Sequence, residues 1–157
     1  MKKVRPLKIP WDYVGEEALD RGSYLLILRL KQKRYINVGS LGKIFFKEGF
    51  YIYVGSAMAN LTQRIDRHKR INKPHHWHID ELTTIAEFYR VFLTRSSSRL
   101  ECNIAMALAK IANWSIRGFG SSDCNCETHL FGIKKSPLLL PKFHSVLNFF
   151  RMDHLFI

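Results

Sequence analysis

The sequence predicts an α+β domain with a small, mainly antiparallel central sheet flanked by helices. Short strand-like segments separated by turns fill residues 22–54, helical patterns dominate the later part, and strands and helices do not alternate regularly. With 157 residues, the chain suits a single domain. Within it we expect an N-terminal arm over residues 1–21, a core over residues 22–134 and a C-terminal extension over residues 135–157.

The first strands are predicted from their apolar and aromatic content. Residues 22–30 form a nearly continuous apolar run, which indicates a strand covered on both faces. Residues 34–38 and 43–46 surround a turn at residues 39–42 and predict a hairpin. Residues 50–54 are aromatic and β-branched, which is typical of a strand. Together these segments predict a meander of short antiparallel strands.

A helix is predicted over residues 61–71, with Asn60 and Gln63 as its capping pair. At about 100° per residue, Arg64 and His68 share an arc of about 120° with the apolar residues of this helix. Both side chains are therefore expected to face the protein or a cleft in it. The alternative is that Arg64 extends over the edge of the core and that His68 is an ordinary hydrogen-bonded core histidine.

Four later elements complete the predicted domain. They are a strand over residues 85–93, a helix over 99–113, a short strand over 129–133 and a last helix over 142–150. In the helix over residues 99–113, Glu101 falls in the middle of the apolar face. A buried carboxylate needs a partner, because its desolvation costs several kcal/mol. That partner is either an arginine in a structural ion pair or a metal ion.

The charge of the chain narrows the class of its partner. Lysine and arginine number 25 against 13 aspartates and glutamates, which gives a formal net charge of +12. This excess favours nucleic acid first, an acidic membrane surface second and an acidic protein third. No apolar run approaches the roughly 20 residues of a membrane-spanning helix, and no secretory signal is recognisable. Three cysteines are an odd number, which suits a reducing cytoplasm.

Several blocks of the sequence resemble the GIY-YIG nuclease pattern. Tyr24 ends a Gly-x-Tyr segment, and Tyr53 begins a Tyr-x-Gly segment. An Asn-Leu pair then opens a helix that carries Arg64 and, four residues later, His68. In this family a glutamate on a subsequent helix binds a divalent metal ion, and Glu101 is the matching residue. The resemblance implies the fold of that family.

The resemblance is closer to one branch of small GIY-YIG-like proteins, some of which are fused to endonuclease III-type DNA repair enzymes. It covers roughly residues 22–131. The blocks that carry it most specifically are residues 51–57, 67–68, 76–80, 101–102 and 118–124. The segment between Tyr24 and Tyr53 is longer than in typical members, and the predicted hairpin fills it.

The resemblance implies a metal-dependent endonuclease with five catalytic residues. Tyr24 would help to deprotonate the attacking water, and Tyr53 would hold the water or the phosphate by a hydrogen bond. Arg64 would stabilise the developing negative charge, while His68 would orient a tyrosine or relay a proton. Glu101 would hold one Mg²⁺ or Mn²⁺ ion, since a hard cation prefers oxygen ligands.

A separate group of residues carries softer ligands. The segment Cys124-x-Cys126-x-x-His129 has a spacing compatible with zinc, and Cys102 is available as a fourth ligand. Two cysteines separated by one residue are less typical of zinc than two separated by two. The alternative is a set of buried thiols beside a glycine-rich turn.

Basic and aromatic residues near the first helix are candidates for nucleic-acid binding. Arg67, Lys69 and Arg70 are expected to contact phosphates without reading bases. His78 lies in a histidine-rich segment that contains Trp77, and it is a candidate for contact with the nucleic acid. A purely structural role at the end of the sheet is the alternative for this segment.

These observations predict a cytoplasmic, metal-dependent endonuclease-like protein that hydrolyses nucleic-acid phosphodiester bonds. DNA is the favoured substrate over RNA, with a role in repair. No membrane partner is expected. Two alternatives stay open, namely a non-catalytic nucleic-acid-binding module and an interaction protein that docks on a repair enzyme.

Overall fold

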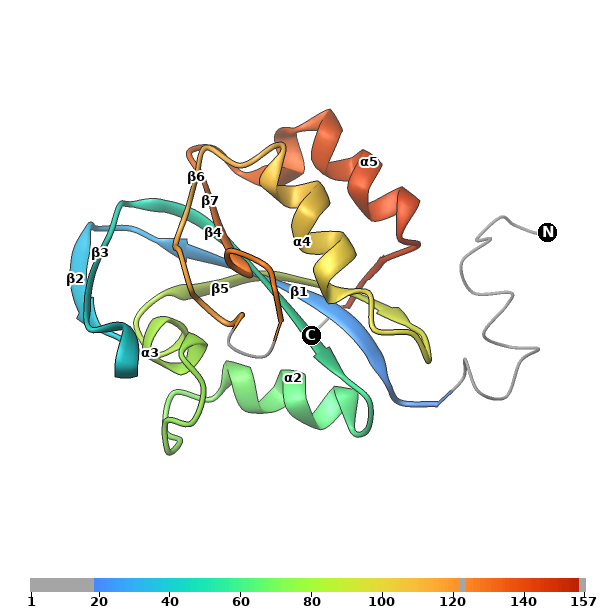
Figure 1. Cartoon of the computed structure of the whole chain (residues 1–157), viewed down its shortest axis with the longest axis horizontal. Helices are drawn as coiled ribbons and strands as arrows, with labels where there is room; N and C mark the ends of the chain where they lie inside the picture. The colour runs from blue at the N-terminus through green and yellow to red at the C-terminus, as the bar shows by residue number, and fades with distance from the viewer. Residues whose placement is uncertain (1–18, 122–123, 156–157) are drawn as a thin grey trace.

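A computed structural model of the chain confirms the predicted α+β fold class (Figure 1). The structure describes residues 19–121 and 124–155. Its central sheet has six strands in the order β6-β7-β4-β1-β5-β8, with antiparallel pairing throughout. The strands are β1 (Gly22–Leu30), β4 (Gly49–Ala57), β5 (Glu87–Arg95), β6 (Trp114–Ser115), β7 (Leu130–Ile133) and β8 (Asp153–His154).

Strand β1 lies in the middle of the sheet, as its apolar sequence predicts. It pairs along its length with β4 on one side and with β5 on the other. All of its residues except Arg29 are buried. Alternate side chains enter two separate cores, with Tyr24 and Leu26 on one face and Leu25 and Ile27 on the other. The prediction of a strand covered on both faces is therefore confirmed.

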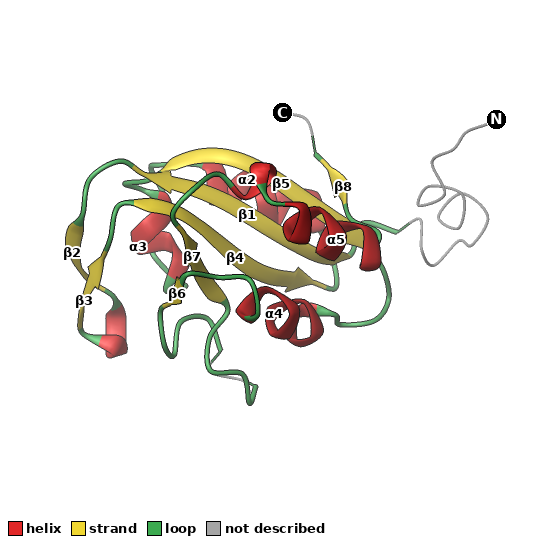
Figure 2. Ribbon diagram, turned by 90° about the horizontal axis from the view of Figure 1, so that it is seen from above, coloured by secondary structure: helices red, strands yellow, loops and turns green. Residues whose placement is uncertain are grey.

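The region between β1 and β4 is not the continuous meander that the sequence predicts. Strands β2 (Arg34–Asn37) and β3 (Lys43–Phe46) form a separate sheet around a short 3-10 turn, Gly39–Leu41. β1 pairs directly with β4 because both strands are long and apolar, whereas β2 and β3 are mostly exposed. The predicted inserted hairpin is confirmed, and Figure 2 shows it at one end of the sheet.

Helices cover both faces of the central sheet (Figure 1). Helices α2 (Leu61–Lys69) and α3 (Ile79–Thr83) pack on the face that carries Tyr24. Helices α4 (Glu101–Ala109) and α5 (Pro141–Phe149) pack on the opposite face. Helix α3 was not predicted, because five residues are too few to show a helical period.

The C-terminal part of the chain adds to both the sheet and the second core. The predicted last helix is confirmed as α5, which follows a 3-10 turn at Pro137–Leu139. Strand β8 extends the sheet by pairing with β5, where Phe92 faces His154. Neither β6 nor β8 was predicted, since two residues carry no alternation pattern. Among the described residues, no helix has the length and apolar character needed to cross a membrane.

The C-terminal end of α2 differs from the prediction. The helix ends at Lys69 rather than at Ile71, and the Ile71 side chain is 70% exposed. Lys73 donates hydrogen bonds to the carbonyl oxygens of Arg67 and His68, at 3.2 and 2.8 Å. The Lys73 ammonium group thus satisfies two of the last carbonyls of α2, which explains why the helix stops there.

The N-terminal end of α2 also corrects the prediction of an Asn60–Gln63 capping pair. Asn60 adopts a left-handed conformation with φ 56°, and its side chain makes no capping hydrogen bond. The cap comes from Asp20, whose carboxylate accepts hydrogen bonds from the Thr62 amide and hydroxyl at 3.1 and 2.8 Å. The Asp20 carbonyl accepts a further hydrogen bond from the Leu61 amide. A capping residue so distant in sequence leaves no local signal.

Candidate functional site

A polar cleft of about 380 Å³ opens on the face of the sheet that α2 covers. Four of the five predicted catalytic residues line it, and they come from four different elements. These residues are Tyr24 of β1, Tyr53 of β4, Arg64 of α2 and Glu101 of α4. The cleft is completed by residues of the histidine-rich segment and by Arg99. The fold therefore brings together side chains that lie far apart in the sequence.

Tyr24 lines the cleft, and the fifth predicted residue, His68, contacts it from behind. The Tyr24 hydroxyl lies 2.9 Å from Nε2 of His68, within hydrogen-bonding distance. Both residues are buried, and each is only 1% exposed to solvent. The expectation that His68 faces the protein is confirmed. Its contact with Tyr24 shows that it lies behind the tyrosine and does not line the open cleft.

The register between β1 and β4 makes room for the Tyr24 ring. Tyr24 stands opposite Gly55, and a side chain on Gly55 would collide with the ring and hydroxyl of Tyr24. A similar close approach occurs at Gly120, where the Tyr53 ring lies 2.9 Å from the position that a Cβ atom would take. Gly120 also has a φ of +70°, which favours glycine. Both glycines thus let a tyrosine ring lie across the backbone.

The protonation states of the two tyrosines follow from their burial. Burial raises the pKa of Tyr24 to about 12, although the positive charge of Arg64 acts in the opposite direction. Burial also raises the pKa of Tyr53 well above its ordinary value, with the neighbouring Tyr24 adding to the effect. Both phenols are therefore neutral near pH 7, and each can donate a hydrogen bond.

His68 is held in its neutral form. Burial lowers the pKa of His68 to about 3, and the positive charge of Lys73 adds to the decrease. A neutral imidazole can accept the Tyr24 hydroxyl proton in a hydrogen bond through Nε2. His68 is consequently better suited to orienting Tyr24 than to carrying a proton away from it.

We expect His68 to make the protein less stable as the pH falls from about 7 to about 5. A histidine whose folded pKa lies below its unfolded value of about 6.5 binds more protons when unfolded, so stability decreases below that value. The contribution of His68 over this range is about 1–2 kcal/mol. Urea unfolding of wild type and of His68→Gln at both pH values measures it. An equal loss of stability in the two proteins would contradict this assignment.

Arg64 lies at the side of the cleft, partly buried, as its place on the helical wheel predicts. Its guanidinium group donates a hydrogen bond to the carbonyl oxygen of Ser56 at 3.3 Å. The same group stacks over the Trp77 ring at 4.6 Å from the ring centre. These two contacts fix the guanidinium at the wall of the cleft, where it remains part of the lining.

Arg67 has a different environment from the one that the sequence suggests. Its guanidinium group donates to both carboxylate oxygens of Asp80, at 2.9 and 3.0 Å, and to the carbonyl of Pro74 at 2.8 Å. It also stacks on Trp77. Through these contacts Arg67 holds the segment from Pro74 to Asp80 against α2. The phosphate contact expected of Arg67 stays a prediction.

Asp80 is the centre of this structural network and was not singled out from the sequence. It is fully buried, and it accepts hydrogen bonds from the amides of His76 and Trp77 at 2.7 and 3.0 Å. Burial alone would raise the pKa of Asp80, but Arg67 and these two amides hold it well below its usual range. The position of Asp80 between the apolar residues Ile79 and Leu82 was the signal in the sequence that could have indicated the burial of this carboxylate.

The other candidates for nucleic-acid binding are more accessible. Arg70 is exposed at the end of α2, and Lys69 lies 3.7 Å from Asp66 in a partly exposed ion pair. His78 lines the cleft and packs against Phe119, with ring centres 5.9 Å apart. The structure thus places His78 next to the tyrosines and places Lys69 and Arg70 farther along α2.

Glu101 is less buried than its position on the predicted helix suggests, and its side chain is 22% exposed. The reason is that α4 begins at Glu101, so this residue lies in the first turn at the cleft and not within the packed face. Its carboxylate lies 3.5 Å from Arg99 and 3.9 Å from Nδ1 of His129. A half-buried carboxylate in a polar cleft could serve as a ligand for a cation.

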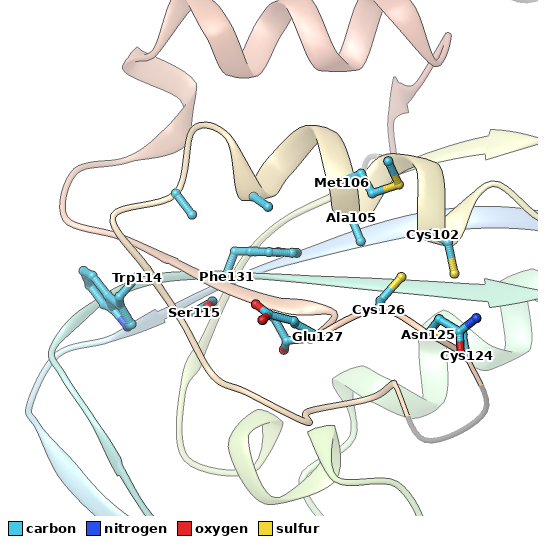
Figure 3. A pocket seen from close by; sticks show the side chains of 13 residues that line it. Cys102, Ala105, Met106, Trp114, Ser115, Cys124, Asn125, Cys126, Glu127 and Phe131 are labelled. Atoms are coloured by element: carbon cyan, nitrogen blue, oxygen red, sulfur yellow. The ribbon is translucent and has the colours of Figure 1, made fainter.

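A second site lies beside this cleft, where Cys102 of α4 meets the segment that precedes β7. Cys102, Cys124, Cys126 and His129 form a group that could hold a metal ion, with all four ligand atoms within 4.8 Å of one another. The three cysteines also line a cavity of about 790 Å³ (Figure 3). Its other walls include apolar residues of α4, Trp114 of β6 and Phe131 of β7, and none of the five predicted catalytic residues lines it.

The fold and the cleft define an α+β domain whose site combines two tyrosines, an arginine and a glutamate. A family model described as "Domain of unknown function DUF123" matches residues 23–151, and the chain belongs to this family. No curated protein and no solved structure matches the chain.

Proposed function

We propose that the protein is a GIY-YIG-like, metal-dependent endonuclease that hydrolyses nucleic-acid phosphodiester bonds. The observation that carries this proposal is the single cleft lined by Tyr24, Tyr53, Arg64 and Glu101, with His68 bonded to Tyr24. Hydrolysis of a phosphodiester needs an oriented water, positive charge at the phosphate and help for the leaving oxygen. The cleft contains a residue suited to each of these tasks.

The two tyrosines would orient the reacting groups. The Tyr24 hydroxyl would donate to Nε2 of His68, 2.9 Å away, and an oxygen lone pair of Tyr24 would then accept a hydrogen bond from a water molecule. Tyr53 is neutral because burial raises its pKa, and its hydroxyl would donate to the phosphate. The Arg64 charge partly offsets the effect of burial on the pKa of Tyr24 and thereby favours the phenolate, the form of Tyr24 that would accept a proton from that water.

The positive charges of the cleft would neutralise the phosphate. Arg64 is held at the wall by Ser56 and Trp77, so little conformational freedom is lost when it meets a phosphate oxygen. Arg99 adds a second, exposed guanidinium at the edge of the cleft. This arrangement favours the transition state, in which negative charge builds up on the phosphate.

Glu101 is the residue that would hold a divalent ion, Mg²⁺ or Mn²⁺. Its half-buried carboxylate offers a hard oxygen ligand in a polar cleft with room for water ligands, which fits such an ion. When bound there, the ion would supply positive charge to the phosphate and to the leaving oxygen.

The nucleic acid itself would be held by charge outside the cleft. The net charge of +12 favours a polyanion, and at the end of α2 Lys69 is partly exposed and Arg70 is exposed. His78 would contact the strand next to the reacting phosphate, since it lines the cleft. We favour DNA, a role in repair and a cytoplasmic location, where the three free cysteines would stay reduced.

Purified protein should nick supercoiled plasmid DNA in the presence of Mg²⁺ or Mn²⁺ and not in the presence of EDTA. Tyr24→Phe should slow cleavage by about a hundredfold, because proton transfer to a positioned group contributes at least this factor. Tyr35→Phe is the matched control, since Tyr35 is exposed on the hairpin. Equal rates for wild type and Tyr24→Phe, or no cleavage of DNA or RNA with any divalent ion, would refute the proposal.

The second candidate is a nucleic-acid-binding module without catalysis. It is favoured by the protonation states of the cleft, where both tyrosines have raised pKa values and neutral His68 has a strongly lowered one. None of these three groups is therefore a ready base near pH 7. Affinity for DNA that falls steeply with salt, together with an absence of cleavage, would support this candidate.

A further inference from the structure

The cluster of Cys102, Cys124, Cys126 and His129 lies outside the cleft of the proposed nuclease. Cys102 is the second residue of α4, the other two cysteines belong to the segment before β7, and His129 immediately precedes β7. Figure 3 shows Cys102 and Cys126 at the same end of the large cavity. The three cysteines are free thiols and are partly buried. The fold thus gathers every cysteine of the chain at one point.

The distances within this cluster match a single tetrahedral ion. Nε2 of His129 lies 3.5 Å from Sγ of Cys124 and 3.9 Å from Sγ of Cys102. Bonds of about 2.3 Å to sulfur and about 2.0 Å to nitrogen would hold tetrahedral ligand atoms about 3.5–3.8 Å apart. Small movements of the side chains are therefore sufficient to close the four ligands around one ion.

The types of ligand select among metals. Three thiolates and one imidazole are soft or intermediate ligands, which favour zinc over magnesium or manganese. Ligand atoms within 4.8 Å of one another suit one ion better than an iron–sulfur cluster, whose ligands bind different iron atoms. Four protein ligands leave no open position, so the ion would be structural rather than catalytic.

We propose that Cys102, Cys124, Cys126 and His129 bind one zinc ion that fastens the segment before β7 to the start of α4. His129 is already anchored to the sheet, because its carbonyl oxygen accepts a hydrogen bond from the Val54 amide at 2.9 Å. The ion would therefore connect β4, α4 and this segment at one point.

The second ring nitrogen of His129 gives the zinc site a link to Glu101. Nε2 faces the sulfur atoms, and Nδ1 lies 3.9 Å from a carboxylate oxygen of Glu101. Histidines that bind a metal through one nitrogen commonly direct the other toward a carboxylate, which orients both groups. His129 would thus act as a positioning residue for Glu101. Only this last step rests on the proposed nuclease function, and zinc binding itself does not.

Elemental analysis of protein purified without chelators tests the proposal. We expect one zinc per chain in wild type and in His144→Gln, an exposed histidine outside the cluster. Zinc content should fall at least tenfold in Cys126→Ser. Wild type without stoichiometric zinc, stoichiometric iron in its place, or full zinc content in Cys126→Ser would overturn the site. Nuclease activity does not enter this measurement, so its outcome is independent of the proposed function.

Replacing zinc by cobalt in the wild-type protein tests the metal site even if Cys126→Ser fails to fold. Tetrahedral Co²⁺ bound by three thiolates should give intense visible bands and a thiolate-to-cobalt charge-transfer band. Zinc added in one equivalent should remove them. Absence of the charge-transfer band in folded wild type would also overturn the assignment.

Discussion

Glu101→Gln should reduce metal-dependent cleavage by at least about a thousandfold, since a catalytic cation contributes several kcal/mol to the transition state. Glutamine keeps the size of the side chain but removes the negative charge that would hold the ion. The fold should survive, because the carboxylate lies at the first turn of α4 and its ion pair with Arg99, at 3.5 Å, involves an exposed guanidinium. Single-turnover nicking rates with saturating Mg²⁺ or Mn²⁺ measure the effect.

Glu87→Gln is the matched control for this variant, since Glu87 is exposed on β5 and lies outside the cleft. Thermal melting and zinc content should be measured on the same samples, so that loss of fold or of the zinc site is distinguished from loss of the cation at Glu101. Cleavage by Glu101→Gln at the rate of wild type would remove Glu101 from the catalytic site.

Asp80→Ala should lower the free energy of unfolding by about 3–5 kcal/mol, the usual cost of removing one partner of a buried ion pair. The variant leaves the Arg67 guanidinium without its two carboxylate bonds, and the buried Lys73 ammonium loses a carboxylate 3.9 Å away. The amides of His76 and Trp77 also lose their acceptor. Urea unfolding at neutral pH, followed by circular dichroism, measures the change.

Asp66→Ala is the control for Asp80→Ala. Asp66 is 63% exposed and lies 3.7 Å from Lys69, so its removal should cost no more than about 1 kcal/mol. A similar small cost for both variants would show that the Asp80 network contributes little to stability.

Because Trp77 stacks under both Arg64 and Arg67, Asp80→Ala should also loosen the wall of the cleft.

The sequence was sufficient for those parts of the fold that depend on local pattern. β1 and β4 are long and apolar, and each was recognised from its own composition. The pairing of β1 directly with β4 could not be recognised in this way, because it depends on which strands bury the most surface in the assembled sheet. The cap from Asp20 on α2 is likewise a contact between distant parts of the chain.

The candidate site was predictable to a similar extent. Helical spacing alone placed Arg64 and His68 toward the protein, and the structure has them at the cleft and behind it. Spacing placed Arg67 outside the inward arc but could not indicate its ion pair with Asp80, because only tertiary contacts bring Asp80 to α2. The burial of Glu101 was overestimated since the start of α4 was placed two residues too early.

The position of β1 between two long partners has a consequence for how the cleft can open. The floor of the cleft carries Tyr24, which lies on β1. Because β1 is hydrogen-bonded to a strand on each side, exposing Tyr24 further requires nearly global unfolding. The segment from Pro74 to Asp80 is instead held mainly by one buried carboxylate and its partners. Local opening of that wall would cost less free energy than opening of the floor. This wall could therefore move while the Tyr24 hydroxyl beneath it keeps its alignment.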